Sequence, residues 1–165
     1  MNVPAESELT TYVEGAYFHD TYSATLIDPN QTAMEAYLAI FTKTPPIVAA
    51  LMNMRNAIVS KLGLKNLGAM NEIKESKTAS DYKVGDMAGI FSLVSLSDSE
   101  VIGEDSDKHL DVRVSFYIEK QAGKSILHAT TVVHVHNIWG KLYMFFVTPF
   151  HKMIVPYSIR SITQK

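Results

Sequence analysis

The sequence predicts an α+β domain with the helix-grip fold, in which a curved antiparallel sheet wraps around a C-terminal helix. Two observations carry this prediction. Strand-like segments follow one another from residue 88 to residue 147, and strands grouped in this way are typical of an antiparallel sheet rather than of βαβ repeats. Helix-start signals precede this block at Thr32 and Thr44, and another follows it at Thr148.

A first strand is predicted over residues 16–27, where aromatic and β-branched residues end at an Asp-Pro-Asn turn signal. Thr32 and Glu35 then have the spacing of a capping box, in which each residue satisfies a free backbone donor of the other. We therefore expect a short helix that ends at about Lys43.

A second helix is predicted over residues 45–62. Two prolines after Thr44 fit the first helical turn, which needs no amide donors, and Gly63 is a typical stop. Residues 64–84 lack a clear period, so we expect a long loop or an irregular strand there.

The sheet is expected to continue through five further strands, at residues 88–97, 100–105, 109–119, 125–137 and 141–147. The strand at 109–119 alternates clearly, which predicts one buried face. That face carries Leu110, Val112, Val114, Phe116 and Ile118.

The final helix is predicted to begin at Thr148 and Pro149 and to end at about Ile162, with a kink at Pro156. Its apolar stripe is expected to contain Phe150, Met153, Ile154, Tyr157 and Ser161. We expect a cavity between this helix and the sheet.

Composition limits the function classes. The chain has 165 residues, the size of one domain, and we expect a single domain with residues 1–15 disordered or loosely attached. Fifteen Lys and Arg against 17 Asp and Glu, with no basic block, argue against a nucleic-acid partner. The absence of cysteine excludes disulfides and thiolate chemistry.

Targeting and cofactor signals are missing from the sequence. The N-terminus lacks the basic start and apolar run of a secretory signal, so the expected location is the cytoplasm. The most apolar segment is interrupted by Asn53, Arg55 and Asn56, and is therefore too short for a membrane span. Without a glycine-rich nucleotide motif or a standard catalytic motif, we expect no cofactor.

The segment "TTVVHVHN" places His134 and His136 on the same face of a strand. The opposite face is more apolar, which predicts that both histidines point away from the core. A hairpin register with Asp111 opposite His134 also places His109 opposite His136. These four side chains could bind a divalent metal, although a solvated, mixed-charge sheet face is the favoured interpretation.

Arg55 lies near the middle of the apolar arc of the predicted second helix. Its guanidinium stays charged, so on an apolar face it needs a carboxylate or several carbonyl groups as hydrogen-bond acceptors. An ion pair with Glu104, Asp105 or Asp107 would attach this helix to the sheet. Alternatively, Arg55 faces the cavity and binds a ligand carboxylate or phosphate, or its stem simply extends to water.

His109 and Asp111 flank the entry of a polar loop into a strand. A histidine beside carboxylates can act as a general base near neutral pH, or it can only close the loop through hydrogen bonds. His151 is expected in the first turn of the last helix, where capping or packing is the favoured role.

Four segments carry a family resemblance: "TPPIVAALMNMRNAIVSKLGL", "YKVGDMAGIF", "GEDSDKHLDVRVSF" and "HNIWGKLYMFFVTPFHKMIV". Across residues 17–160 the chain resembles the bacterial domain-of-unknown-function 2867 family, grouped with the START-like (SRPBCC, polyketide cyclase-like) superfamily. The resemblance implies the helix-grip fold and a cavity suited to an apolar or amphipathic small molecule. It implies no reaction, because fold does not determine function.

Three functional hypotheses follow. The first is a binding module for an apolar or amphipathic small molecule, with Arg55 as polar anchor and a lining that includes Met52, Phe91, Val114, Phe116, Phe150 and Ile154. The second is a cyclase-like or isomerase-like enzyme in the same cavity, with His109, Asp111 and His136 as acid-base candidates. The third is a structural or interaction module that acts as a homodimer.

Overall fold

The structure, a computed structural model, describes residues 3–42, 46, 49–50, 53, 56–57, 60 and 77–163. Most of the predicted second helix and of the following loop lies outside these residues. The positions between 46 and 60 that are described are helical. Arg55 and Met52 lie outside the described residues.

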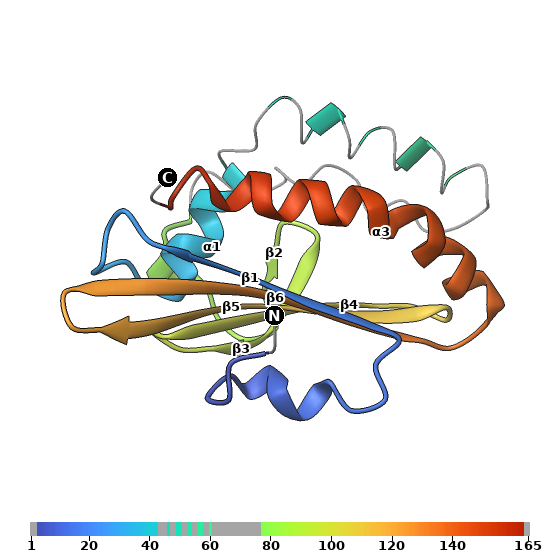
Figure 1. The fold of residues 1–165 in the computed structure, drawn as a ribbon, viewed down its shortest axis with the longest axis horizontal. Helices are drawn as coiled ribbons and strands as arrows, with labels where there is room; N and C mark the ends of the chain where they lie inside the picture. Colours follow the sequence, from blue (N-terminus) through green and yellow to red (C-terminus); the bar gives the residue numbers. More distant parts are fainter. Residues whose placement is uncertain are drawn as a thin grey trace.

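Six antiparallel strands form one sheet in the order β1-β6-β5-β4-β3-β2 (Figure 1). The strands are β1 (Phe18–Thr25), β2 (Met87–Ala88), β3 (Phe91–Leu96), β4 (Glu100–Ser106), β5 (Leu110–Gln121) and β6 (Lys124–Val135). Strands β2 to β6 form a meander, and the first strand returns beside the last one. The strands predicted at residues 16–27, 100–105, 109–119 and 125–137 are thus confirmed. The single strand predicted over residues 88–97 is instead the hairpin of β2 and β3, with a turn at residues 89–90.

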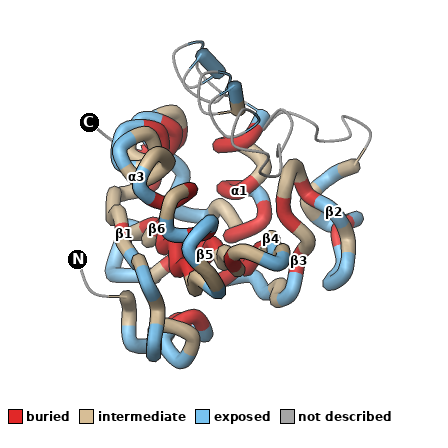
Figure 2. Tube along the Cα trace, turned by 90° about the vertical axis from the view of Figure 1, so that its right-hand side faces the viewer, coloured by how far each residue is buried: buried red, intermediate tan, exposed pale blue. Residues whose placement is uncertain are grey.

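Two helices cover one face of this sheet. α1 (Ala33–Thr42) packs against β4 and β5, and α3 (Ile138–Ile159) packs against β1 and β6. Figure 2 shows the buried residues concentrated between these helices and the strands. The predicted α+β helix-grip fold is confirmed. A short 3-10 helix, η2 (Ala79–Asp81), precedes β2.

The predicted capping box starts α1. Thr32 Oγ1 accepts from the Glu35 amide at 3.3 Å, and Glu35 Oε2 accepts from the Thr32 amide at 2.8 Å. Further along, Tyr37 is fully buried, and its hydroxyl donates to the Ala88 carbonyl at 2.7 Å. The helix is therefore fixed at its start by local capping and in its middle by a contact with β2.

The predicted strand at residues 141–147 is wrong, because these residues belong to α3. Asn137 caps the helix: its Oδ1 accepts from the amides of Trp139 and Gly140. The helix start predicted at Thr148 is wrong for the same reason. Thr148 Oγ1 instead donates to the Met144 carbonyl within the helix at 2.6 Å. The apolar run "LYMFFV" has no polar interruptions, so its period could not distinguish a helix from a buried strand.

The opposite face of the sheet is covered by the N-terminal segment. A 3-10 helix, η1 (Glu8–Tyr12), lies there, with Leu9 buried against Ile102 and Val132 (Figure 1). The buried Glu100 carboxylate accepts from the hydroxyls of Ser7 and Ser115 and from the Glu8 amide. The described part of the N-terminal 15 residues is thus attached to the sheet, where sequence alone indicated a loose segment.

Candidate functional site

A cavity of about 170 Å³ lies between the helix-covered face of the sheet and α3. Strands β1, β3, β4, β5 and β6 contribute side chains to the lining, α3 lies across from them, and α1 adds two residues. Most of the lining is aliphatic or aromatic, and includes Phe18, Ile40, Phe41, Phe91, Leu110, Val112, Val114, Phe116, Ala129, Val133, Met144, Val147, Phe150, Ile154 and Ile159. The cavity thus combines apolar walls with a few polar groups, a composition that is common among small-molecule sites.

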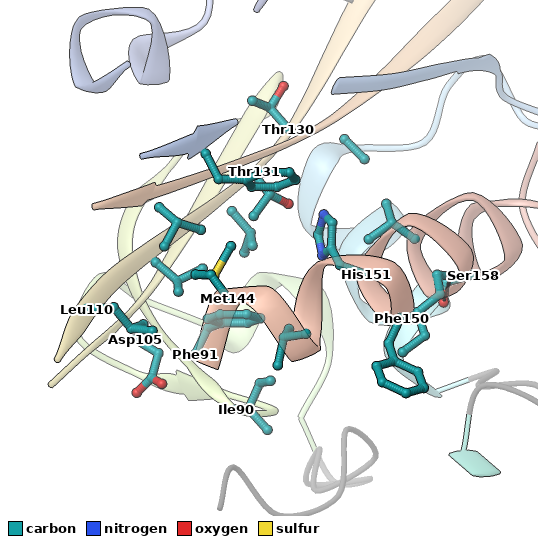
Figure 3. Close-up of a pocket in the computed structure, with 18 of the residues that line it drawn as sticks. Ile90, Phe91, Asp105, Leu110, Thr130, Thr131, Met144, Phe150, His151 and Ser158 are labelled. Atoms are coloured by element: carbon teal, nitrogen blue, oxygen red, sulfur yellow. Dashed lines mark hydrogen bonds between the residues drawn. The ribbon is translucent and has the colours of Figure 1, made fainter. Parts of the chain in front are cut away.

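A histidine on α3 and an aspartate on β1 form a buried pair beside this cavity. His151 extends from α3 toward Thr131 on the sheet (Figure 3), and its Nε2 lies 3.0 Å from Asp20 Oδ1 on β1. Both side chains are more than four-fifths buried. His151 lines the cavity, whereas Asp20 is not among the lining residues. Because Nε2 is hydrogen-bonded to the Asp20 carboxylate, Nδ1 is the ring nitrogen of His151 that could bind a ligand.

Asp20 is a carboxylate on an otherwise apolar strand face. Its second oxygen, Oδ2, is buried without a hydrogen-bond partner among the described residues. Burial raises the pKa of the Tyr22 hydroxyl above its ordinary value, and the negative charge of Asp20 and a side-chain hydrogen bond with Asp20 raise it further. An incompletely satisfied buried carboxylate costs stability, and such groups are concentrated at functional sites.

A second polar group lines the other end of the cavity. His109 stands there with Asp105 and Asp107, and its Nδ1 lies 3.2 Å from Asn137 Oδ1. Asp107 Oδ1 accepts from the amides of His109 and Leu110 at 2.6 and 3.1 Å. This loop is therefore closed by hydrogen bonds next to the start of α3.

The residues predicted to contact a ligand can now be located. Phe91, Val114, Phe116, Phe150 and Ile154 all line the cavity. Phe150 points away from the sheet in Figure 3, so it lies at the α3 side of the space. Contact of these side chains with a ligand stays a prediction.

The acid-base candidates are not gathered at one point. His109 lines the cavity, but Asp111 and His136 are not among the described lining residues. His136 Nε2 lies 2.9 Å from Asp111 Oδ2, and Ser106 donates to the other oxygen of Asp111. Burial alone would raise the pKa of Asp111, but these hydrogen bonds and the positive charge of nearby histidines hold it below the ordinary value.

The predicted hairpin register is confirmed: Asp111 is opposite His134, and the His136 amide donates to the His109 carbonyl at 2.9 Å. The side chains nevertheless diverge, because His134 Nε2 binds the Tyr12 carbonyl at 2.8 Å. Within the described ranges no group of three or more His, Asp and Glu side chains is placed to hold a metal ion.

Sequence reasoning missed the pair formed by Asp20 and His151. A signal for Asp20 was present, since it alternates with Phe18 and Tyr22 on one strand face, where a charge needs a partner. For His151 the expected helix start was wrong. Because α3 begins eleven positions earlier than Thr148 suggests, at Asn137, His151 lies well inside the helix and faces the sheet.

Comparison with known families matches residues 12–158 to the family described as "Protein of unknown function (DUF2867)". No curated protein and no solved structure matches the chain. Among the helices of the described residues, none is long and apolar enough to cross a membrane.

Proposed function

The chain belongs to the family of proteins of unknown function (DUF2867), and on that premise we propose that it binds a small amphipathic molecule between the sheet and α3. The observation that carries the proposal is the cavity with apolar walls and a buried histidine-aspartate pair. Apolar walls favour an apolar body through the hydrophobic effect, and one polar group fixes its orientation.

The volume of the cavity limits the size of the ligand. An engineered apolar cavity of about 150 Å³ binds benzene, and the space here is about 170 Å³. A molecule with one ring and one or two short substituents therefore fits without rearrangement of the walls. Larger ligands require either movement of α3 or a part that stays outside the cavity.

The polar end of the ligand is expected at His151. With Nε2 bound to Asp20, a neutral imidazole presents Nδ1 as an acceptor, so a ligand hydroxyl can donate to it. Asp105 and Asp107 also line the cavity, and their charge disfavours anions. The proposal therefore favours a neutral, hydroxyl-bearing ligand such as a phenol.

Two probes of equal shape test this proposal. p-Cresol and p-xylene differ only by a hydroxyl in place of a methyl group. Titration followed by amide chemical shifts should show tighter binding of p-cresol, by about tenfold if the hydrogen bond contributes about 1.4 kcal/mol. In His151→Phe, which keeps a planar ring but has no hydrogen-bond acceptor, this preference should disappear.

Matched variants separate cavity binding from surface binding. Ala129→Phe fills the cavity, whereas Met153→Phe adds the same ring on the exposed side of α3. The first should abolish binding of both probes and the second should leave it unchanged. Val114→Met serves if Ala129→Phe does not fold. Unchanged binding in folded cavity variants would exclude the proposed site.

A second candidate function, proton transfer, is favoured by the same pair. Asp20 holds His151 in an orientation that leaves Nδ1 as a base, as the carboxylate of a catalytic triad does for its histidine. Nδ1 would take a proton from a carbon next to a ligand carbonyl, leaving an enolate, and return a proton to it. No oxidant or cofactor is required.

Acetophenone distinguishes a catalyst from a binder. Its methyl protons exchange with D₂O when a base removes them, which proton NMR detects directly. Catalysis predicts exchange with the wild-type protein and much slower exchange with His151→Gln. If acetophenone shifts amide signals of the cavity but its protons do not exchange faster than in buffer, the protein is a binder only.

A further inference from the structure

α3 carries an unusual number of large apolar side chains on its solvent side. Ile138 is 70 % exposed, Trp139 52 %, Phe145 73 % and Met153 56 %. Together with Tyr157, they make up half of the exposed large apolar residues among the described parts of the chain. An exposed apolar group of this kind indicates an interaction surface rather than chance exposure.

These side chains share one side of the helix. At 100° per residue, Ile138, Phe145 and Met153 fall on an arc opposite to the buried Tyr143 and Ile154. Trp139 and Tyr157 border the same arc. α3 therefore has two apolar sides: one faces the cavity and the sheet, and the other, which we call the outer face of α3, faces solvent.

The charge of this helix has a single sign. Lys141, Lys152 and Arg160 are exposed, and residues 137–163 contain no Asp or Glu. This contrasts with the net charge of −2 for the whole chain. Basic residues beside exposed Trp, Phe and Tyr are the pattern of helices that lie on anionic membranes.

We propose that the outer face of α3 is a docking surface for an anionic phospholipid membrane. Lys141, Lys152 and Arg160 would meet lipid phosphates, while Trp139, Phe145 and Met153 enter the boundary between headgroups and acyl chains. This proposal rests on exposure and charge, so it does not depend on the cavity having a ligand.

Two prolines fit a helix at the membrane surface rather than within it. Pro149 and Pro156 have no amide hydrogen, so the carbonyls of Phe145 and Lys152 lack their usual helical donors. Such carbonyls need water, which the headgroup region supplies and the hydrocarbon core does not.

A second copy of the chain is a less suitable occupant. A two-fold axis across the middle of α3 would place Lys141 of one copy near Arg160 of the other, and like charges in an interface weaken it. A phospholipid surface instead supplies the opposite charge along the whole helix.

Trp139 is the only tryptophan of the chain and reports on docking. The protein is titrated with vesicles of phosphatidylcholine alone and with vesicles that also contain phosphatidylglycerol. We expect a blue shift of the Trp139 emission and co-sedimentation only with the second kind. The bound fraction should fall as salt is added, because salt screens exposed charges.

Paired variants identify the surface. Lys141→Glu with Lys152→Glu should weaken vesicle binding about tenfold or more, since each basic residue near an anionic surface contributes roughly a fivefold factor. Phe145→Ser should also weaken vesicle binding, and it leaves Trp139 in place as the fluorescent reporter. Lys120→Glu and Val94→Ser, on exposed parts of the sheet, are the controls and should bind as the wild type does.

Three results would overturn the proposal. These are no binding to anionic vesicles, equal loss of binding in the control variants, or a dimer that Phe145→Ser converts to a monomer in light scattering. The last result would assign the outer face of α3 to a second copy of the chain.

Discussion

At the scale of single residues, the most informative feature is the contrast between two buried carboxylates. Glu100 accepts three hydrogen bonds and is satisfied, so it holds the N-terminal segment on the sheet. Asp20 has the His151 ring on Oδ1 and the Tyr22 hydroxyl nearby, but its Oδ2 lacks a hydrogen-bond partner among the described residues. A buried carboxylate with a purely structural role is expected to have all its hydrogen bonds made, as Glu100 has. The unpaired oxygen of Asp20 is therefore the reason for assigning the site to this residue.

Glu100→Gln should lower the free energy of unfolding by about 1–3 kcal/mol. The glutamine side chain replaces one carboxylate oxygen by an NH2 group, which is itself a donor. Because Ser7, Ser115 and the Glu8 backbone amide all donate to Glu100, one hydrogen bond to a charged acceptor is lost. Urea unfolding measures the change. Glu14→Gln, at an exposed position, is the control, and an equal effect in both would mean that Glu100 has no anchoring role.

Asp111 predicts a dependence of stability on pH. Its pKa is lower in the folded than in the unfolded chain, so the ionised group stabilises the fold above the unfolded pKa. That contribution is lost as the pH falls through the folded pKa.

Thermal unfolding of wild type and Asp111→Asn should therefore differ at neutral pH and converge in acid. The exposed Asp98→Asn variant is the reference. A difference between wild type and Asp111→Asn that stays constant down to acid pH would contradict this account of the His136–Asp111 pair.

At the scale of elements, the start of α3 determines the site. Asn137 places the helix start directly after β6, and this brings His151 opposite Asp20. The strands and α1 were predictable, because alternation and the Thr32–Glu35 box are local signals. The first half of α3 was not predictable, because Thr148 and Pro149 have the pattern of a helix start, while the true cap at Asn137 follows β6 after a single residue.

Asn137→Ala should lower the free energy of unfolding by about 1–2 kcal/mol, since two amides of the first turn lose their acceptor. Asn137→Asp keeps the acceptor but cannot donate to the Lys108 carbonyl, so its stability should lie between the two. Chemical denaturation measures all three. Equal stability of the alanine variant and wild type would exclude the cap.

Gly140→Ala tests how closely α3 approaches the sheet. A Cβ there would overlap the His109 carbonyl oxygen and lie 2.9 Å from Val135 Cγ1. Alanine favours a helix over glycine by about 1 kcal/mol, but forcing the backbone apart costs about 1–3 kcal/mol. We expect net destabilisation in urea unfolding, and little effect from Lys141→Ala. A more stable Gly140→Ala protein would show that α3 can move away from β6.

At the scale of the whole molecule, the sheet has a different function on each face. The N-terminal segment covers one face through Leu9 and the Glu100 contacts, and its Tyr12 carbonyl binds His134, while His136 pairs separately with Asp111. α1 and α3 cover the other face and leave the cavity. Alternation in β5 and β6 predicted which face is which. The pairing of Asp20 with His151 was not predictable, because it joins residues 131 positions apart.

A crystal of the protein soaked with 4-bromophenol would show whether the cavity binds a small amphipathic molecule. Anomalous scattering locates the bromine atom independently of any model of the ligand. We expect one bromine between Val114, Phe116 and α3, with the hydroxyl oxygen within hydrogen-bond distance of His151. Bromine sites found only on the outer face of α3, or none at all, would contradict it.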